Sequence, residues 1–99
     1  MNKGAYYTER EQYIRALEVV LRPVQDFNRL RYVNEFYADT EFIQLSNVLG
    51  DAIFIDITAK SMEEIFKEVA RAINGQTPYG LVKDLEKRRH IAGLFQRVA

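Results

Sequence analysis

The chain has 99 residues, of which 47% are hydrophobic and 28% charged, a composition typical of one ordinary globular domain over 1–99. Because it contains no cysteine and a single histidine, His90, we expect no disulfide framework, no thiol catalysis and no cysteine or multi-histidine metal site. The 14 basic and 14 acidic residues give zero formal net charge, so no overall field favours nucleic acid or an anionic membrane.

The N-terminal residues lack the apolar run of a signal peptide, since Glu9 and Glu11 follow closely. No uncharged run approaches the roughly 20 apolar residues that a membrane-spanning helix needs. A chain with these features and no cysteine is expected in the cytoplasm, without a membrane segment.

The first predicted element is a helix. Residues 8–11 have the form of a capping box, in which a hydroxyl and a carboxylate three positions apart bind the first amides of a helix. Apolar residues then recur at spacings of three and four positions, at Ile14, Leu17, Leu21 and Val24. This pattern predicts an amphipathic helix over 8–22, which ends before Pro23 because proline disfavours helical geometry in the preceding residue.

The middle third of the chain changes from a helical period to alternation. Three runs rich in aromatic and β-branched residues, 31–38, 41–48 and 51–57, are separated by short turns at 39–40 and 49–50. Connections as short as these indicate an antiparallel meander. In the third run, alternation places on one face Ile53, Ile55 and Ile57.

A second capping box opens the next predicted helix at residues 61–64, ahead of an apolar stripe. Gly75 stands where a left-handed C-cap is common, so we predict a helix over 61–74.

In the last segment of the chain, Asp84 and Arg88 fall on the apolar side of a helical pattern. They could form a pair against the core, but we favour a helix that begins only at Asp84 as its N-cap. This interpretation leaves residues 81–82 in a loop packed on the core.

The resulting order, α-β-β-β-α-α, predicts an α+β fold: a two-layer sandwich whose three-stranded antiparallel sheet carries the helices on one face. The opposite sheet face, with residues such as Phe42, Phe54 and Asp56, would then stay open. This order of elements is similar to that of some small phage-encoded inhibitors, including certain anti-CRISPR proteins. The resemblance is carried by no motif; it implies a mobile-element accessory protein and assigns no site.

Charge is unevenly placed along the chain. No Lys or Arg occurs over 32–59, a stretch that holds the acidic residues Glu35, Asp39, Glu41, Asp51 and Asp56. Short strands and turns favour Asp and Glu for local hydrogen bonds, which is the simpler explanation. The functional hypothesis is a non-enzymatic module whose exposed, acidic sheet face binds a protein partner or a second copy. Its candidate contacts are Glu35, Tyr37, Asp39, Glu41 and Asp56.

The chain offers few groups for catalysis. His90 is the only histidine, and the scattered glycines form no phosphate-binding loop. Adjacent carboxylates at Glu63 and Glu64 belong to a helix start, where the helix dipole explains them. We therefore expect no enzyme, no cofactor and no small-molecule substrate.

The densest basic segment supplies an alternative function. A nucleic-acid-binding accessory protein would contact phosphates through Lys87, Arg88 and Arg89. A solvated helix face explains the same residues, because adjacent side chains of a helix cannot all project one way. Nucleic acid is therefore the less favoured partner.

Overall fold

The computed structural model describes residues 3–21, 23, 27–35, 39–47 and 51–98. They form α1 (Lys3–Leu21), β1 (Phe27–Glu35), β2 (Thr40–Asn47), β3 (Ala52–Asp56), α2 (Met62–Ile73) and α3 (Leu85–Val98). This order, with a three-stranded antiparallel sheet, confirms the predicted α-β-β-β-α-α arrangement of an α+β fold. Within these ranges, no helix combines the length and the apolar composition that crossing a bilayer requires.

The sheet is a meander in the order β1-β2-β3, so β2 is central and the other two strands are its edges. β1 pairs with β2 from Glu35↔Thr40, next to the connection, to Phe27↔Asn47, with an irregularity between Phe27 and Arg29. β2 pairs with β3 from Phe42↔Asp56 to Ser46↔Ala52.

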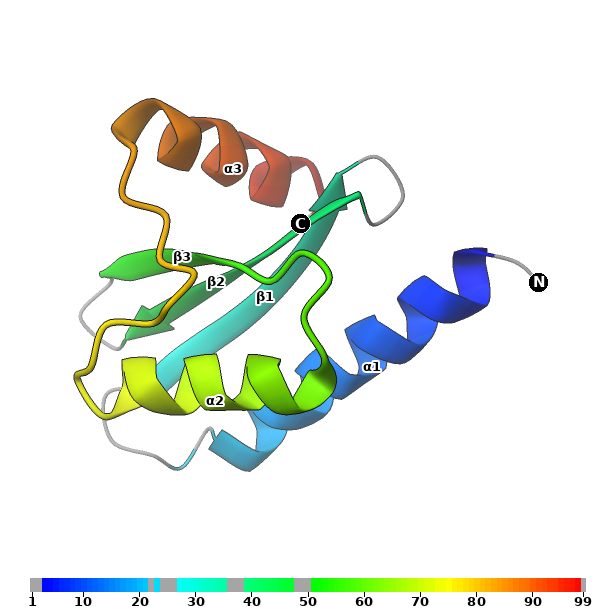
Figure 1. Ribbon diagram of the computed structural model, residues 1–99, viewed down its shortest axis with the longest axis horizontal. Helices are drawn as coiled ribbons and strands as arrows, with labels where there is room; N and C mark the ends of the chain where they lie inside the picture. Colours follow the sequence, from blue (N-terminus) through cyan, green and yellow to red (C-terminus); the bar gives the residue numbers. More distant parts are fainter. Residues whose placement is uncertain (1–2, 22, 24–26, 36–38, 48–50, 99) are drawn as a thin grey trace.

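One face of the sheet is covered by α1 and α2, which lie together on the same side of it (Figure 1). The predicted isoleucine face of β3 is confirmed here, since Ile55 and Ile57 are fully buried against these helices. The core cluster consists of Ile14, Leu17, Leu30, Ile43, Leu45, Ile55, Ile57, Ile65 and Val69.

The opposite face of the sheet is covered by α3, which lies across the sheet from α1 and α2 (Figure 1). Phe42 is 2% exposed, and Phe54 and Ile91 are also buried in this second cluster, together with Val33 and Val82. The prediction that the helices share one face therefore holds for α1 and α2 but not for α3. The physical reason is that burying a side chain of phenylalanine size stabilises the fold by about 1.5–3 kcal/mol. An open face carrying two such rings would forgo that gain.

Element boundaries differ most at the N-terminus. α1 begins at Lys3, so residue 8 lies inside the helix and is not its N-cap. Nothing in the preceding residues, such as a proline, forbids a helix, so the capping pattern alone did not mark its start. The helix ends at Leu21, before Pro23, as predicted. β1 spans Phe27–Glu35 and so begins before the predicted residue 31, because its pairing with β2 continues through earlier residues. Residues 36–38 of the predicted strand lie outside the described part of the chain.

The signals at the ends of α2 and α3 are confirmed. The Ser61 side chain accepts a hydrogen bond from the Glu64 amide at 3.1 Å, and the Glu64 carboxylate accepts one from the Ser61 amide at 2.8 Å. Gly75 follows the helix with φ of +78°, the left-handed conformation that glycine adopts readily. Asp84 caps α3 by accepting a hydrogen bond from the Lys87 amide at 2.7 Å.

Candidate functional site: the open edge of β1

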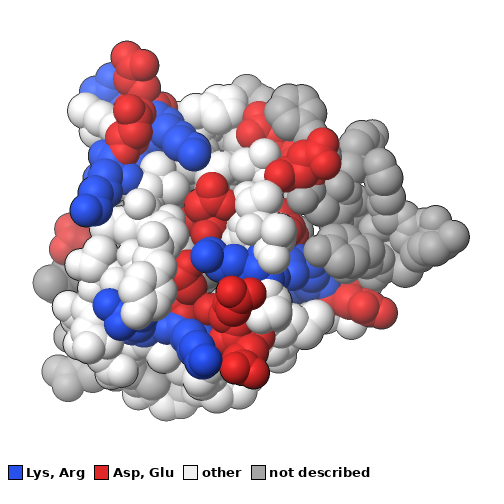
Figure 2. Space-filling view, viewed as in Figure 1, with Lys and Arg blue, Asp and Glu red and all other residues white. Residues whose placement is uncertain are grey.

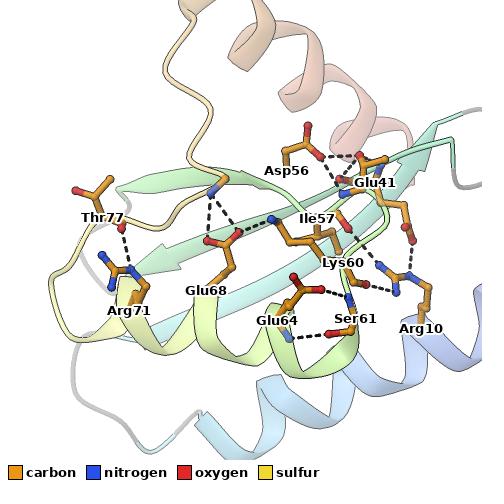
Figure 3. A network of polar contacts seen from close by, with 12 residues as sticks. Arg10, Glu41, Asp56, Ile57, Lys60, Ser61, Glu64, Glu68, Arg71 and Thr77 are labelled. Carbon is orange, nitrogen blue, oxygen red and sulfur yellow. Dashed lines mark hydrogen bonds and ion pairs between the residues drawn. The ribbon is translucent and has the colours of Figure 1, made fainter.

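Glu41, a predicted partner contact, is fully buried in the structure. Arg10 of α1 donates from Nε to its Oε2 at 2.5 Å (Figure 3). The Tyr32 hydroxyl donates to the same oxygen at 2.7 Å. Burial, then the hydrogen bond and the charge of Glu41, raise the pKa of Tyr32 well above its ordinary value. Glu41 therefore binds within its own chain and belongs to no docking surface.

The same arginine fixes the connection between β3 and α2. Its guanidinium donates to the backbone oxygen of Lys60 at 3.0 Å and to that of Ile57 at 3.4 Å (Figure 3). At the end of β3, Asp56 Oδ1 accepts hydrogen bonds from the Thr58 amide at 2.9 Å and from the Thr58 hydroxyl at 2.6 Å. Asp56, a second predicted contact, is thus the last residue of β3, and its side chain fixes the chain where it leaves the sheet.

The other predicted acidic contacts are not gathered on one face either. The Glu35 carboxylate lies 3.1 Å from His90 Nε2 of α3, Asp39 is exposed in the turn before β2, and Tyr37 falls outside the described residues. Figure 2 shows acidic and basic side chains interspersed over one side of the molecule. The expected acidic sheet face is therefore absent from the described residues, because α3 covers the sheet there and Glu41 points into the other core.

The predicted nucleic-acid contacts on α3 are also divided. The Lys87 ammonium lies 5.6 Å from the centre of the Phe42 ring, and the Arg88 guanidinium lies 5.8 Å from that of Phe54. Arg88 also donates to the Ala52 oxygen at 3.3 Å, whereas Arg89 is exposed. Two of the three cations are thus placed over the sheet and do not form one basic face with the third.

The outer edge of β3 is covered by the chain itself. The Asp56 amide donates to the Gly80 oxygen at 2.9 Å, and the Val82 amide donates to the Phe54 oxygen at 2.9 Å. Val82 is buried, which confirms the predicted packing of residues 81–82 on the core. This segment, 80–82, satisfies the edge of β3 and leaves little of it for a partner.

Glu68 of α2 anchors that covering segment. Its carboxylate accepts the Gly80 amide at 3.1 and 3.2 Å and lies 3.4 Å from the Lys60 ammonium (Figure 3). The side chain of Glu68 is only 4% exposed, so both contacts are made in a largely desolvated place.

The outer edge of β1 is different. The Leu30 amide donates to the Glu18 carboxylate of α1 at 2.9 Å, so it points away from β2. Backbone groups of alternate residues in a strand point the same way, which directs those of Tyr32 and Asn34 outward as well. Outside the strand ladder, no backbone oxygen of the described residues accepts a hydrogen bond from the amides of Tyr32 or Asn34. These two residues leave an open stretch of strand edge.

A groove of about 360 Å³ runs between α1 and this edge. Its base is apolar, since Ile14 and Leu30 are among the lining residues and both are almost fully buried. Its charged lining comes from both walls and includes Glu18 of α1 and Arg29 and Arg31 of β1. The site is therefore a groove with an apolar base, charged side chains on both walls and the outer edge of β1 along one side.

Reasoning from the sequence did not find this site. The alternation Arg29-Leu30-Arg31-Tyr32 indicates a strand with two cations on one face. The predicted first strand began only at residue 31, so that alternation was cut in the middle. Whether an edge strand is left open depends on which distant segments of the chain pack against it, and a local sequence pattern does not predict this.

Comparisons with models of protein families, with curated proteins and with solved structures found no match. What supports a function for the β1 edge is therefore its geometry alone.

Proposed function

We propose that this chain is a small, non-enzymatic interaction module that binds an extended segment of a partner protein along the edge of β1. The partner segment would lie in the groove beside α1 and add a strand to the sheet, a common mode of peptide recognition. The edge replaces the open sheet face of the sequence hypothesis, because α3 covers that face.

One observation carries this proposal: the outward amides of Tyr32 and Asn34 have no backbone acceptor outside the strand ladder among the described residues, and Tyr32 lines a groove beside α1. Each hydrogen bond that an added strand makes there contributes about 0.5–1.5 kcal/mol net. Apolar side chains of the partner that reach the base of the groove contribute further through burial. Binding of this kind suits an inhibitor-like accessory protein of the cytoplasm, which acts by occupying a strand of its target.

A proline at Asn34 tests the proposal. Asn34→Pro removes an outward amide and leaves the pairing of β1 with β2 in place, because that amide is not part of the ladder. Peptides would first be selected on the wild-type chain from a displayed random library. We expect their binding to be lost in Asn34→Pro and retained in the matched control Asn34→Ala, and the Tyr32 amide to exchange more slowly with solvent when a peptide is bound.

Selected peptides that bind Asn34→Pro as well as they bind Asn34→Ala would contradict the proposal. Retention of the chain on heparin, lost at high salt and on joint neutralisation of Lys87, Arg88 and Arg89, would instead support the nucleic-acid alternative.

A further inference from the structure

We infer that the segment bound at the β1 edge is acidic, with Asp or Glu alternating with apolar residues, and that Glu18 competes with it for the Leu30 amide. This inference rests on the proposed edge pairing and adds the chemistry of the partner. It is drawn from the charges on β1, the apolar base of the groove and the position of the Glu18 carboxylate.

The charges on β1 favour acidic side chains on one face of an added strand. Arg29 and Arg31 are two positions apart, so their side chains project from the same face of the strand. Their register partners on β2 are the uncharged residues Ser46 and Gln44. A strand added on the other side of β1 would place its own residues opposite them, where opposite charges are stabilising.

The other face of an added strand would meet α1. Leu30 and Tyr32 project from β1 toward that helix, and they line the groove together with Ile14. Ile14 and Leu30 are buried, whereas Tyr32 is half-buried and directs its hydroxyl to Glu41. Partner residues on this face therefore meet an apolar surface. Because side chains alternate between the two faces of a strand, the partner sequence alternates acidic and apolar residues.

Glu18 occupies the place of the first partner carbonyl. Its Oε2 accepts the Leu30 amide at 2.9 Å, which is the hydrogen bond that a backbone oxygen of an added strand would take. Its carboxylate also repels an acidic segment in the groove. Full pairing along Leu30, Tyr32 and Asn34 therefore requires that Glu18 give up this bond, and binding is weaker in its presence than without it.

The test uses two labelled synthetic peptides of about eight residues, one alternating Glu with Val and the other Lys with Val. Fluorescence anisotropy measures their affinity for the full chain. We expect the acidic peptide to bind more tightly, and the double variant Arg29→Glu, Arg31→Glu to bind it about tenfold more weakly and to prefer the basic peptide. The control carries Lys67→Glu on α2 and Arg89→Glu on α3, which change the net charge equally at exposed positions elsewhere.

The role of Glu18 is tested by two variants that separate charge from occupancy. Glu18→Gln removes the repulsion but keeps an acceptor for the Leu30 amide, whereas Glu18→Ala removes both. We expect affinity for the acidic peptide to rise a few-fold in Glu18→Gln and further in Glu18→Ala. An unchanged or reduced affinity in both would overturn the competition.

Two kinds of failure can be told apart. Equal binding of both peptides, with loss of binding in Asn34→Pro, would overturn the acidic partner and leave the edge pairing intact. Failure of both peptides to bind, while library-selected peptides still depend on the Asn34 amide, would likewise overturn the acidic partner and leave the edge pairing intact. Peptide binding that is indifferent to Asn34→Pro would overturn the edge pairing itself.

Discussion

The two edge strands of the sheet, β1 and β3, present the same kind of backbone groups, but the chain covers the edge of β3 and leaves part of the edge of β1 open. At β3 the segment 80–82 returns alongside the strand and pairs with Phe54 and Asp56, and Glu68 holds it in place. At β1 the neighbour is α1, which offers one side chain, Glu18, to one amide and leaves a groove beyond it. An edge satisfied by its own chain is a structural element, whereas an edge left open beside a groove is available for recognition.

The open edge also carries features that restrict what can pair with it. The irregularity between Phe27 and Arg29 interrupts regular pairing at one end, and Arg29 and Arg31 place like charges along the strand. Bulges and charged side chains at edges discourage indiscriminate association between sheets. Under the proposed function, the same two cations would also favour an acidic partner strand.

The largest expected effect is at the covered edge. A Cβ at Gly80 would lie 2.4 Å from the Asp56 oxygen and 2.9 Å from Glu68 Oε2, so Gly80→Ala forces the covering segment away from β3. We expect a loss of about 2–3 kcal/mol in the free energy of unfolding, measured by urea denaturation.

Gly93→Ala is the matched control for that substitution. Among the described residues no atom lies within 4 Å of a Cβ built at Gly93, which is inside α3. Alanine should therefore stabilise the chain by about 0.5–1 kcal/mol through helix propensity. If Gly80→Ala were as well tolerated as Gly93→Ala, the covering segment would not be tightly fixed.

A comparison of proline with alanine at each edge measures the same difference directly. The Asp56 amide is bonded to Gly80, so Asp56→Pro should be less stable than Asp56→Ala by about 1–3 kcal/mol. The Asn34 amide points away from β2 and has no backbone acceptor outside the ladder among the described residues, so Asn34→Pro and Asn34→Ala should differ by less than about 0.5 kcal/mol. Equal differences at the two positions in urea denaturation would mean that both edges are equally occupied.

Hydrogen exchange should detect the hydrogen bond between the Leu30 amide and the Glu18 carboxylate at the open edge. In Glu18→Ala the Leu30 amide loses its only described acceptor, and we expect it to exchange about tenfold faster, read out by NMR. The amides of Tyr32 and Asn34 should keep their exchange rates, because Glu18 accepts the Leu30 amide and neither of theirs. Glu11→Ala, which removes a carboxylate paired instead with Arg15, is the control and should leave Leu30 unchanged.

The smallest expected effect concerns α2, which carries Glu68 and so supports the covered edge. The Ser61 amide, followed by its hydroxyl, holds the pKa of the exposed Glu64 carboxyl below its ordinary value of 4.5. Because the folded pKa is lowered, this carboxylate contributes stability above its unfolded pKa, and the contribution disappears as pH falls through the folded pKa. Unfolding at a series of pH values should show Glu64→Gln destabilised at neutral pH and equal to wild type in acid.

Glu63→Gln is the control for that titration. Glu63 stands in the same helical turn but its carboxylate lies 3.3 Å from the Lys67 ammonium and is not part of the capping box. A stability difference as large and as pH-dependent in Glu63→Gln as in Glu64→Gln would mean that charge near the helix start matters and that the cap does not.

Local signals in the sequence predicted much of the secondary structure. The capping box at Ser61, the glycine after α2, the Asp84 cap and the stop before Pro23 are all confirmed. Each depends on φ restrictions or on hydrogen bonds between residues a few positions apart, so neighbouring residues suffice to specify it. The alternation of β3 likewise predicted which of its residues face α1 and α2.

The tertiary structure alone decided which surfaces are available. Alternation separates the two faces of a strand, but it cannot say that α3 covers the second face or that β1 has an open edge. Arg10 and Glu41 are 31 positions apart, and only the packing of α1 on the sheet brings a charge that looked like a surface contact into a buried pair. Burial and edge exposure depend on what folds back from distant parts of the chain, and those contacts leave no local pattern in the sequence.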